Sequence, residues 1–288
     1  MLKITFPDGK QKEYESGVTG FDIAADISLS LSKVAIAILV NGHQKDLADS
    51  INEDSLVNII TLKDDSGLEI MRHTIAAQVL ARAIKNIYPE AKLAIGPTIE
   101  NGFYYDVLFK NSISSDDLSS IENEMKKIVK EGHLINKKNK NKNEAIKLFE
   151  KLNEPYKIQI INDSLQENDF QIYQQGETNF FDLCKGPHLP SLKFIGEFKL
   201  TKVSGAYWRG DSKNEMLQRI YGTAWRNKKE LDSYLSMLEE AEKRDHRKIG
   251  KEMDLFHFQD DAPGSVFWHS KGWSIFNKLV DYMRNKQE

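Results

Sequence analysis

The order of predicted strands and helices along this chain constrains its fold most. Short segments in which apolar and polar residues alternate, typical of strands, are followed closely by segments with helical spacing. Leu2, Ile4 and Phe6 alternate with polar residues. The turn pair Asp8-Gly9 follows them, so a hairpin is predicted at the N-terminus. A helix and two further strands are expected at Phe21–Ser28, Val34–Val40 and Ser55–Leu62. The first 62 residues are therefore predicted to form a small sheet with one helix across it.

The following region combines longer helices with strands. Lys63–Glu69 is polar and is predicted to be a linker, and an apolar stripe at helical spacing begins beyond Met71 and stops near Pro89. Ala94–Phe109 is predicted to contain two strands about a turn. Ser114–Gly132 begins with N-cap residues and ends in glycine, which predicts a helix.

Charged segments mark the rest of the chain. Asn136–Glu144 is rich in lysine and is predicted to be a solvated loop, with a phosphate-facing patch as the alternative. Lys229–Phe256 begins as an amphipathic helix and then becomes a charged connector. The last segment, Trp273–Glu288, has a helical pattern with no closing element, which indicates a piece of a longer protein.

The composition excludes several classes of protein. With 40% hydrophobic and 29% charged residues, the chain is suited to folded cores rather than to disorder. Its net charge of −3 gives no overall basic field, so contacts with a polyanion would depend on local patches. A single cysteine permits no disulfide within the chain. Without a signal peptide or an apolar run of about 18 residues, a cytoplasmic protein with no membrane segment is expected.

The single cysteine lies in a short polar motif, DLCKGPH, from Asp182 to His188. Together with His73, Cys184 and His188 would supply three ligands, enough for a catalytic zinc with an open position. A Cys/His pair could instead form an activated nucleophile, and a polar pocket could direct water onto an ester. The motif alone leaves these alternatives open, beside that of a small buried thiol.

Three longer stretches carry a more specific signal. They are DLCKGPHLP (182–190), GAYWRGDSKNEMLQRIYGTAW (205–225) and LEEAEKRDHRKIGKEMDLFHFQ (238–259). On these stretches the sequence closely resembles the bacterial threonyl-tRNA synthetase family. The resemblance runs in the same order along the chain, from residue 1 to 288. The resemblance implies an α+β chain with a ubiquitin-like (β-grasp) TGS domain at 1–62, an editing domain with an antiparallel sheet at 63–226, a linker helix at 227–250 and the start of the class II aminoacylation core at 251–288.

The resemblance also implies a function. In this family the complete chain attaches threonine to its tRNA with ATP and Mg, and a zinc ion lies in the catalytic core. The adenylate-binding motifs and zinc ligands are expected beyond residue 288, so no cofactor is expected in the present chain. Serine lacks one methyl group of threonine, and a single pocket discriminates on that basis by only about 1–3 kcal/mol. The part present here is therefore expected to hydrolyse misacylated seryl-tRNA(Thr).

The family's pattern assigns roles to particular residues. Those expected to be catalytic are His73, Lys157 and His188, and those expected to contact the substrate are Tyr105, Asp182, Cys184 and Gln78. Lys157 would be a cationic donor, and Asp182 would bind the substrate ammonium or orient a partner. Cys184 would contact the small side chain as a free thiol without a metal.

One position departs from the family's pattern, in which the first editing helix carries His-x-x-x-His on one face. Four residues beyond His73 stands Ala77. Alignment on the following ARAIK instead places Gln78 in the second position, with one extra residue near Thr74–Ile75. Because an extra residue turns a helix by about 100°, we expect it to be absorbed at the helix start. Glutamine is no base near neutral pH, so weaker deacylation and a crippled metal site are expected.

Two other interpretations stay open. The chain could bind the acceptor end of threonine tRNA without hydrolysing it, with Lys137–Lys142 and Lys243–Lys251 meeting phosphates. It could also regulate or oligomerise. Since the family pairs mainly through its catalytic core, a monomer is expected for this chain and a homodimer for the full-length protein. A deacylation assay separates an enzyme from a binding module.

Overall fold

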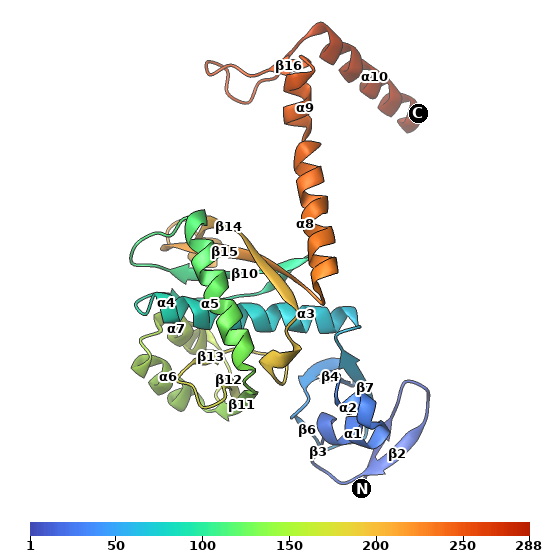
Figure 1. Cartoon of the computed structure of the whole chain (residues 1–288), viewed down its shortest axis with the longest axis vertical. Coiled ribbons are helices and arrows are strands. Elements are labelled where there is room, and N and C mark those ends of the chain that lie inside the picture. The colour runs from blue at the N-terminus through green and yellow to red at the C-terminus, as the bar shows by residue number, and fades with distance from the viewer. The chain divides into compact units, whose positions relative to one another are not determined.

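The first 62 residues form a five-stranded sheet with one main helix across it (Figure 1). In sheet order the strands are β2 (Gln11–Tyr14), β1 (Leu2–Thr5), β7 (Ser55–Thr61), β4 (Ala35–Val40) and β5 (His43–Asp46). β1 and β7 are parallel, whereas the other neighbouring strands are antiparallel. The predicted hairpin, helix and strands are confirmed, and their arrangement is the β-grasp expected from the resemblance.

The helix that packs on this sheet is stabilised by a hydrogen-bonded N-terminus and by a buried apolar side chain. α1 (Gly20–Ile27) begins at Thr19, whose hydroxyl accepts the N–H of Asp22 while the Asp22 carboxylate accepts the N–H of Thr19. Ile23 is fully buried against the sheet. The remaining elements are α2 (Leu29–Ser32) and the two-stranded pair β3 (Val18–Thr19) and β6 (Ser50–Ile51).

Two antiparallel sheets form the next part of the chain. The first contains β14 (Glu197–Tyr207), β15 (Met216–Trp225), β10 (Gly102–Leu108) and β8 (Lys92–Leu93), with β9 (Thr98–Ile99) paired to β10. The second contains β11 (Ile135–Lys140), β12 (Phe170–Gln175) and β13 (Phe181–Leu183). The α+β class with antiparallel sheets is therefore confirmed.

Helices cover these sheets, and α4 and α5 pack side by side (Figure 1). The α-helices are α3 (Asp65–Thr74), α4 (Ala81–Ile87), α5 (Leu118–Glu131), α6 (Lys142–Lys151) and α7 (Pro155–Asp163). Three short 3₁₀ turns are η2 (Ser115–Asp117), η3 (Leu192–Phe194) and η4 (Trp208–Gly210). The predicted helix at Ser114–Gly132 is confirmed, and Gly132 ends it in the left-handed conformation with φ 64°.

Two predictions about polar segments are wrong. The expected linker Lys63–Glu69 instead contains the start of α3, because Gly67 lets the helix approach the Thr61 carbonyl too closely for any side chain. The expected loop Asn136–Glu144 instead contributes to β11 and α6. β11 pairs with β12 along its whole length, and the Lys137 ammonium is neutralised by Asp46 and Asp49 rather than left for phosphate. Lysine content alone cannot show such pairing.

The structure describes all residues from 1 to 288, as a computed structural model in two compact units, Met1–Leu231 and Asp232–Glu288. The proposed boundaries at 62, 226 and 250 stay predictions. α8 (Lys228–Lys243) crosses from the first unit into the second. The other elements there are α9 (His246–Glu252), β16 (Phe256–His257), β17 (Phe267–Trp268) and α10 (Ser270–Gln287).

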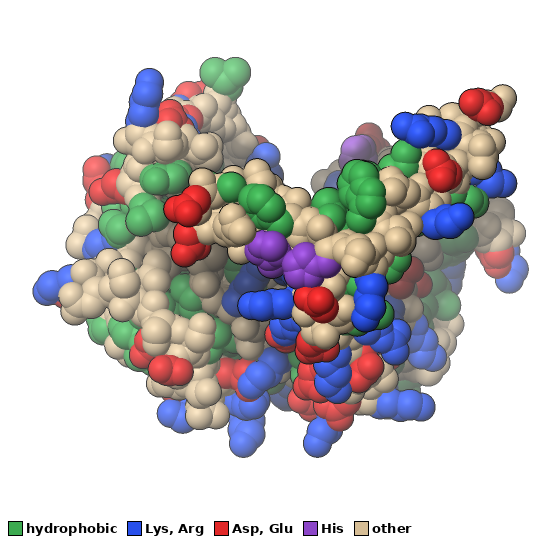
Figure 2. Space-filling view, turned by 90° about the horizontal axis from the view of Figure 1, so that it is seen from above, with side chains coloured by type: hydrophobic (Ala, Val, Ile, Leu, Met, Phe, Trp, Pro, Cys, Tyr) green, Lys and Arg blue, Asp and Glu red, His purple; other side chains and the backbone are tan.

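Charge is spread over the surface in both signs. On the face shown in Figure 2, acidic and basic side chains are interspersed. In the basic stretch Lys243–Lys251, four cations pair with acidic neighbours: Lys243 and Arg244 with Glu240, Lys248 with Glu242, and Arg247 with Asp245. These exposed pairs leave no strong basic field there. None of the helices is both long enough and apolar enough to cross a membrane.

The helix that begins with α3 contains one turn with an extra residue. Between α3 and α4 lies the π-helical segment η1 (Ile75–Leu80), in which the Ala81 N–H donates to the Ala76 carbonyl five residues earlier. A π turn holds one residue more than an α turn, and such turns are common at functional sites. We had expected the extra residue at the helix start, but it is absorbed inside the helix, in this π turn. The buried faces of α3 and α4 both pack into the core.

Removal of Ala76 should return this segment to α-helical hydrogen bonding and leave the flanking faces in register. We expect the free energy of unfolding to fall by no more than about 2 kcal/mol. Removal of Ala83, which lies in the regular helix α4, should rotate buried side chains out of the core and abolish folding. Urea unfolding followed by circular dichroism measures both, and equal losses for the two deletions would contradict the assignment.

Candidate active site

A cavity of about 870 Å³ lies in the first unit and is lined by residues from both antiparallel sheets. The sequence-predicted residues that line it are His73 at the end of α3, Tyr105 on β10, Lys157 on α7, Asp182 on β13 and Cys184 directly after β13. These residues are up to 111 positions apart in the chain. Two other predicted residues, Gln78 and His188, do not line the cavity.

Lys157, Asp182 and Tyr105 form a buried polar group in the wall. The Lys157 ammonium lies 2.6 Å from Asp182 Oδ1 and donates a hydrogen bond to the Tyr105 hydroxyl at 3.1 Å. Burial disfavours the ammonium, but the adjacent Asp182 carboxylate outweighs burial and raises the pKa of Lys157. Two of the three ammonium protons have protein partners, so the third can be donated to a bound molecule.

His73 and Cys184 contact each other at the cavity surface. His73 Nε2 lies 2.9 Å from Cys184 Sγ, and the ring also forms a hydrogen bond with the Gly96 backbone. Burial lowers the pKa of His73, although the nearby Asp182 carboxylate opposes this. The imidazole is therefore neutral at pH 7, as a proton acceptor must be.

His188 lies behind His73 and supports it. The two rings are stacked, with centroids 4.7 Å apart and an interplanar angle of 5°. The Thr74 hydroxyl donates its only proton to the Ile70 carbonyl at 2.8 Å, so it accepts from His188 Nδ1 at 3.2 Å. His188 Nδ1 therefore carries a proton, and the buried Nε2 of the same ring has no hydrogen-bond partner. No sequence signal singled out Thr74.

Gln78, which we expected to contact the substrate, does not line the cavity, because the π turn points it elsewhere. Its side-chain and backbone oxygens accept hydrogen bonds from the Gln175 amide. Ala77 lines the cavity instead, one α turn beyond His73. The position four residues beyond His73 therefore presents a methyl group to the cavity.

Two glycines allow the backbone to pass close to the site. A side chain at Gly96 would overlap the Tyr105 ring, with its Cβ 2.1 Å from Cδ2. Gly186 has φ 63°, and a Cβ there would lie 2.0 Å from the Tyr173 hydroxyl. Glycine is thus required between Cys184 and His188, where the sequence offered only a Gly-Pro turn.

Comparison with known proteins places these observations in a family context. Residues 2–61 match the model of the TGS domain, and residues 171–221 match that of the "threonyl and alanyl tRNA synthetase second additional domain". The second match includes Asp182, Cys184 and His188. The chain contains a TGS domain and this second additional domain.

Curated relatives extend the likeness to almost the whole chain. The threonine–tRNA ligases of Rickettsia typhi and Paramagnetospirillum magneticum are each 52% identical, over 286 and 290 residues. That of Legionella pneumophila is 52% identical over 286 residues. These alignments cover 99%, 100% and 99% of the chain but only 45%, 45% and 44% of the relatives. The chain is thus similar to the N-terminal region of threonine–tRNA ligases and spans less than half their length.

His73, Cys184 and His188 form the one group that could offer ligands to a metal, with ligand atoms within 4.8 Å of one another. A metal lies near the plane of each imidazole that binds it, yet the two rings are nearly parallel and their planes do not meet nearby. Ala77 adds no fourth ligand. The geometry favours a polar pocket over a metal centre at this group.

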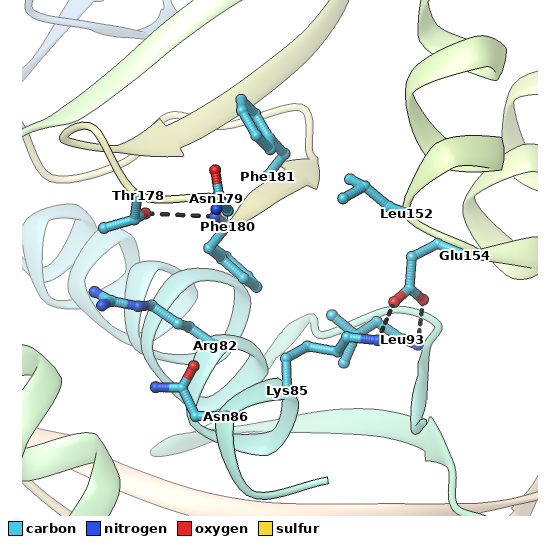
Figure 3. Close-up of a pocket in the computed structure, with 10 residues that line it drawn as sticks. All are labelled: Arg82, Lys85, Asn86, Leu93, Leu152, Glu154, Thr178, Asn179, Phe180 and Phe181. Atoms are coloured by element: carbon cyan, nitrogen blue, oxygen red, sulfur yellow. Dashed lines mark hydrogen bonds and ion pairs between the residues drawn. The ribbon is translucent and has the colours of Figure 1, made fainter. Parts of the chain in front are cut away.

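A smaller cavity of about 250 Å³ is lined in part by Arg82, Lys85 and Asn86 of α4 (Figure 3). Its charged groups already have partners. Lys85 pairs with Glu154 at 2.7 Å, and Arg82 pairs with Glu131 and donates to Gln175. This cavity lacks the imidazoles and the thiol, so it offers no comparable chemistry.

The variant Lys157→Met would leave the Asp182 carboxylate buried without its cation. We expect it to lower the free energy of unfolding by about 3–5 kcal/mol. The double variant Lys157→Met/Asp182→Leu removes both charges, so its free energy of unfolding should be much closer to that of wild type. Urea unfolding followed by tryptophan fluorescence compares them, and a double variant less stable than the single one would contradict the role of the pair.

Proposed function

We propose that this cavity hydrolyses the ester bond of seryl-tRNA(Thr). The observation that carries the proposal is the convergence of His73, Cys184, Lys157 and Asp182 on one cavity. These residues belong to a chain whose sequence is 52% identical, over 286 residues, to a threonine–tRNA ligase. A neutral imidazole, an ammonium and a small polar surface are the groups that ester hydrolysis requires.

The activity of the complete protein is part of the same proposal. We propose that it attaches threonine to its tRNA in the cytoplasm, with ATP and Mg and with a zinc ion in its catalytic core. The present chain would contribute proofreading and would bind the acceptor end of threonine tRNA. We propose a monomer for the chain and a homodimer for the full-length protein.

His73 and Lys157 carry the chemical step in this proposal. A water oxygen attacks the ester carbonyl carbon while His73 Nε2 accepts the water proton. The third Lys157 proton stabilises the oxyanion that forms. When the intermediate collapses, the bond to the terminal ribose oxygen breaks, and that oxygen takes the proton. Serine and an uncharged tRNA end are released. Asp182, already bound to Lys157, orients the ammonium rather than binding the substrate amine.

Selectivity for serine must come from a small part of the cavity. The whole cavity is wide enough for a terminal nucleotide as well as an amino acid, so its overall size cannot exclude one methyl group. Cys184 lies beside His73, and thus beside the site of attack, where an added methyl would meet the thiol. We propose that contacts there reject the threonyl ester.

A binding module without hydrolytic activity is the second candidate, and a specific observation supports it. Ala77 stands where the family's pattern has a second histidine, so one proton-transfer group is missing. In that case the cavity would hold the acceptor end of the tRNA without cleaving the ester.

Ester loss from seryl- and threonyl-tRNA(Thr) separates the two candidates. We expect the wild-type chain to hydrolyse the seryl ester faster than the threonyl ester. The variant His73→Gln should lose activity by about 100-fold or more while keeping its affinity for tRNA. A wild-type chain that binds both esters and hydrolyses neither would establish the binding module.

Replacement of Ala77 tests the position of the missing imidazole. Ala77→His would place a second imidazole on the cavity wall, and we expect deacylation to rise about tenfold or more. Gln78→His is the matched control, because Gln78 faces Gln175 and not the cavity. A gain from Gln78→His and none from Ala77→His, measured under the same single-turnover conditions, would overturn the assigned register.

A further inference from the structure

One carboxylate of the TGS domain reaches the loop that carries His188. Asp46 is the last residue of β5 and is only 8% exposed. Its Oδ1 accepts the backbone N–H of His188 at 2.7 Å. Its Oδ2 accepts the Tyr173 hydroxyl at 2.7 Å and lies 2.9 Å from the Lys137 ammonium. Three donors from beyond the TGS domain therefore converge on one of its side chains.

These contacts continue directly into the candidate active site. The Tyr173 ring packs edge-on against the His188 ring, with centroids 4.4 Å apart and an interplanar angle of 86°. His188 in turn stacks on His73, whose Nε2 contacts Cys184. Asp46 thus holds the His188 backbone directly and the His188 ring through Tyr173.

The loop needs such a restraint. It runs from Cys184 through Gly186 to His188 without belonging to a helix or a strand. Apart from Asp46, the hydrogen bonds that fix its His188 end come from Thr74, whose hydroxyl accepts from His188 Nδ1 and from the Leu189 N–H. Loss of the Asp46 carboxylate would leave the buried His188 N–H and the Tyr173 hydroxyl without this acceptor.

We propose that Asp46 is a positioning residue for hydrolysis, and that the TGS domain is therefore a structural part of the editing site. The inference rests on the proposed function. Asp46 touches no substrate and acts through His188, which keeps the His73 ring at the angle from which it accepts the water proton. Misplacement of a catalytic group by about 1 Å can lower a rate by about 100-fold.

Asp49 offers a matched control on the same domain. Its carboxylate also binds Lys137, and its Oδ2 accepts the Asp46 N–H, but it makes no contact with His188. Asp49→Asn therefore weakens the same junction without removing the His188 acceptor. Asp46→Asn keeps an oxygen that can accept the His188 N–H, whereas Asp46→Ala removes it.

Steady-state deacylation of seryl-tRNA(Thr) tests the proposal in the whole chain. We expect Asp46→Ala to lower kcat between about tenfold and 100-fold with KM within twofold of wild type. Asp46→Asn should show a smaller loss of kcat, and the kcat of Asp49→Asn should stay within twofold of wild type. An unchanged kcat for Asp46→Ala, a loss confined to KM, or an equal loss for Asp49→Asn would overturn the proposal.

Hydrogen exchange of the His188 amide, followed by NMR, gives an answer independent of activity. Asp46→Ala should abolish the protection of this amide but leave amides in the core of β4 protected. In Asp49→Asn, the His188 amide should stay protected. Protection that survives in Asp46→Ala would overturn the positioning role. If wild type hydrolyses neither ester, the proposed function fails, and this exchange measurement alone decides whether Asp46 positions the loop.

Discussion

Lys157 and Asp182 are both withdrawn from water, and neither charge would be stable in that place without the other. Their contact joins α7 to β13, and the Tyr105 hydroxyl adds β10, so one polar group connects elements of both antiparallel sheets. The cavity wall is built on this connection. The same pairing keeps Lys157 charged and leaves one of its protons free, so the contact that holds the wall also leaves a hydrogen-bond donor at the cavity.

The π turn at Ile75–Leu80 shows how a helix can take up an extra residue without losing its packing. Residues on both sides of the turn keep their buried faces, and His73 still reaches the cavity. The change falls on the residues within the turn, where Ala77 meets the cavity and Gln78 is directed to Gln175. The side chain that faces the cavity and the unbroken packing of the helix therefore have the same local cause.

Domain limits and site limits do not coincide in this chain. The matched second additional domain supplies Asp182, Cys184 and His188, but His73, Tyr105 and Lys157 precede it in the sequence. The TGS domain adds Asp46 from the far side of the His188 loop. A site assembled from such separate segments depends on how the domains pack, and not only on the fold of each one.

The sequence by itself determined the strand and helix order of the first 62 residues, because periodicity and turn residues act over short distances. Together with the family likeness it also named five of the residues that line the cavity. It could not reveal that Lys63–Glu69 enters a helix, that the lysine-rich segment forms β11, or that Gln78 faces away. Those outcomes depend on contacts with Thr61, Phe170–Gln175 and Gln175, which lie elsewhere in the chain. Only tertiary packing decides which side chains face one another, because burial and pairing are properties of the assembled core.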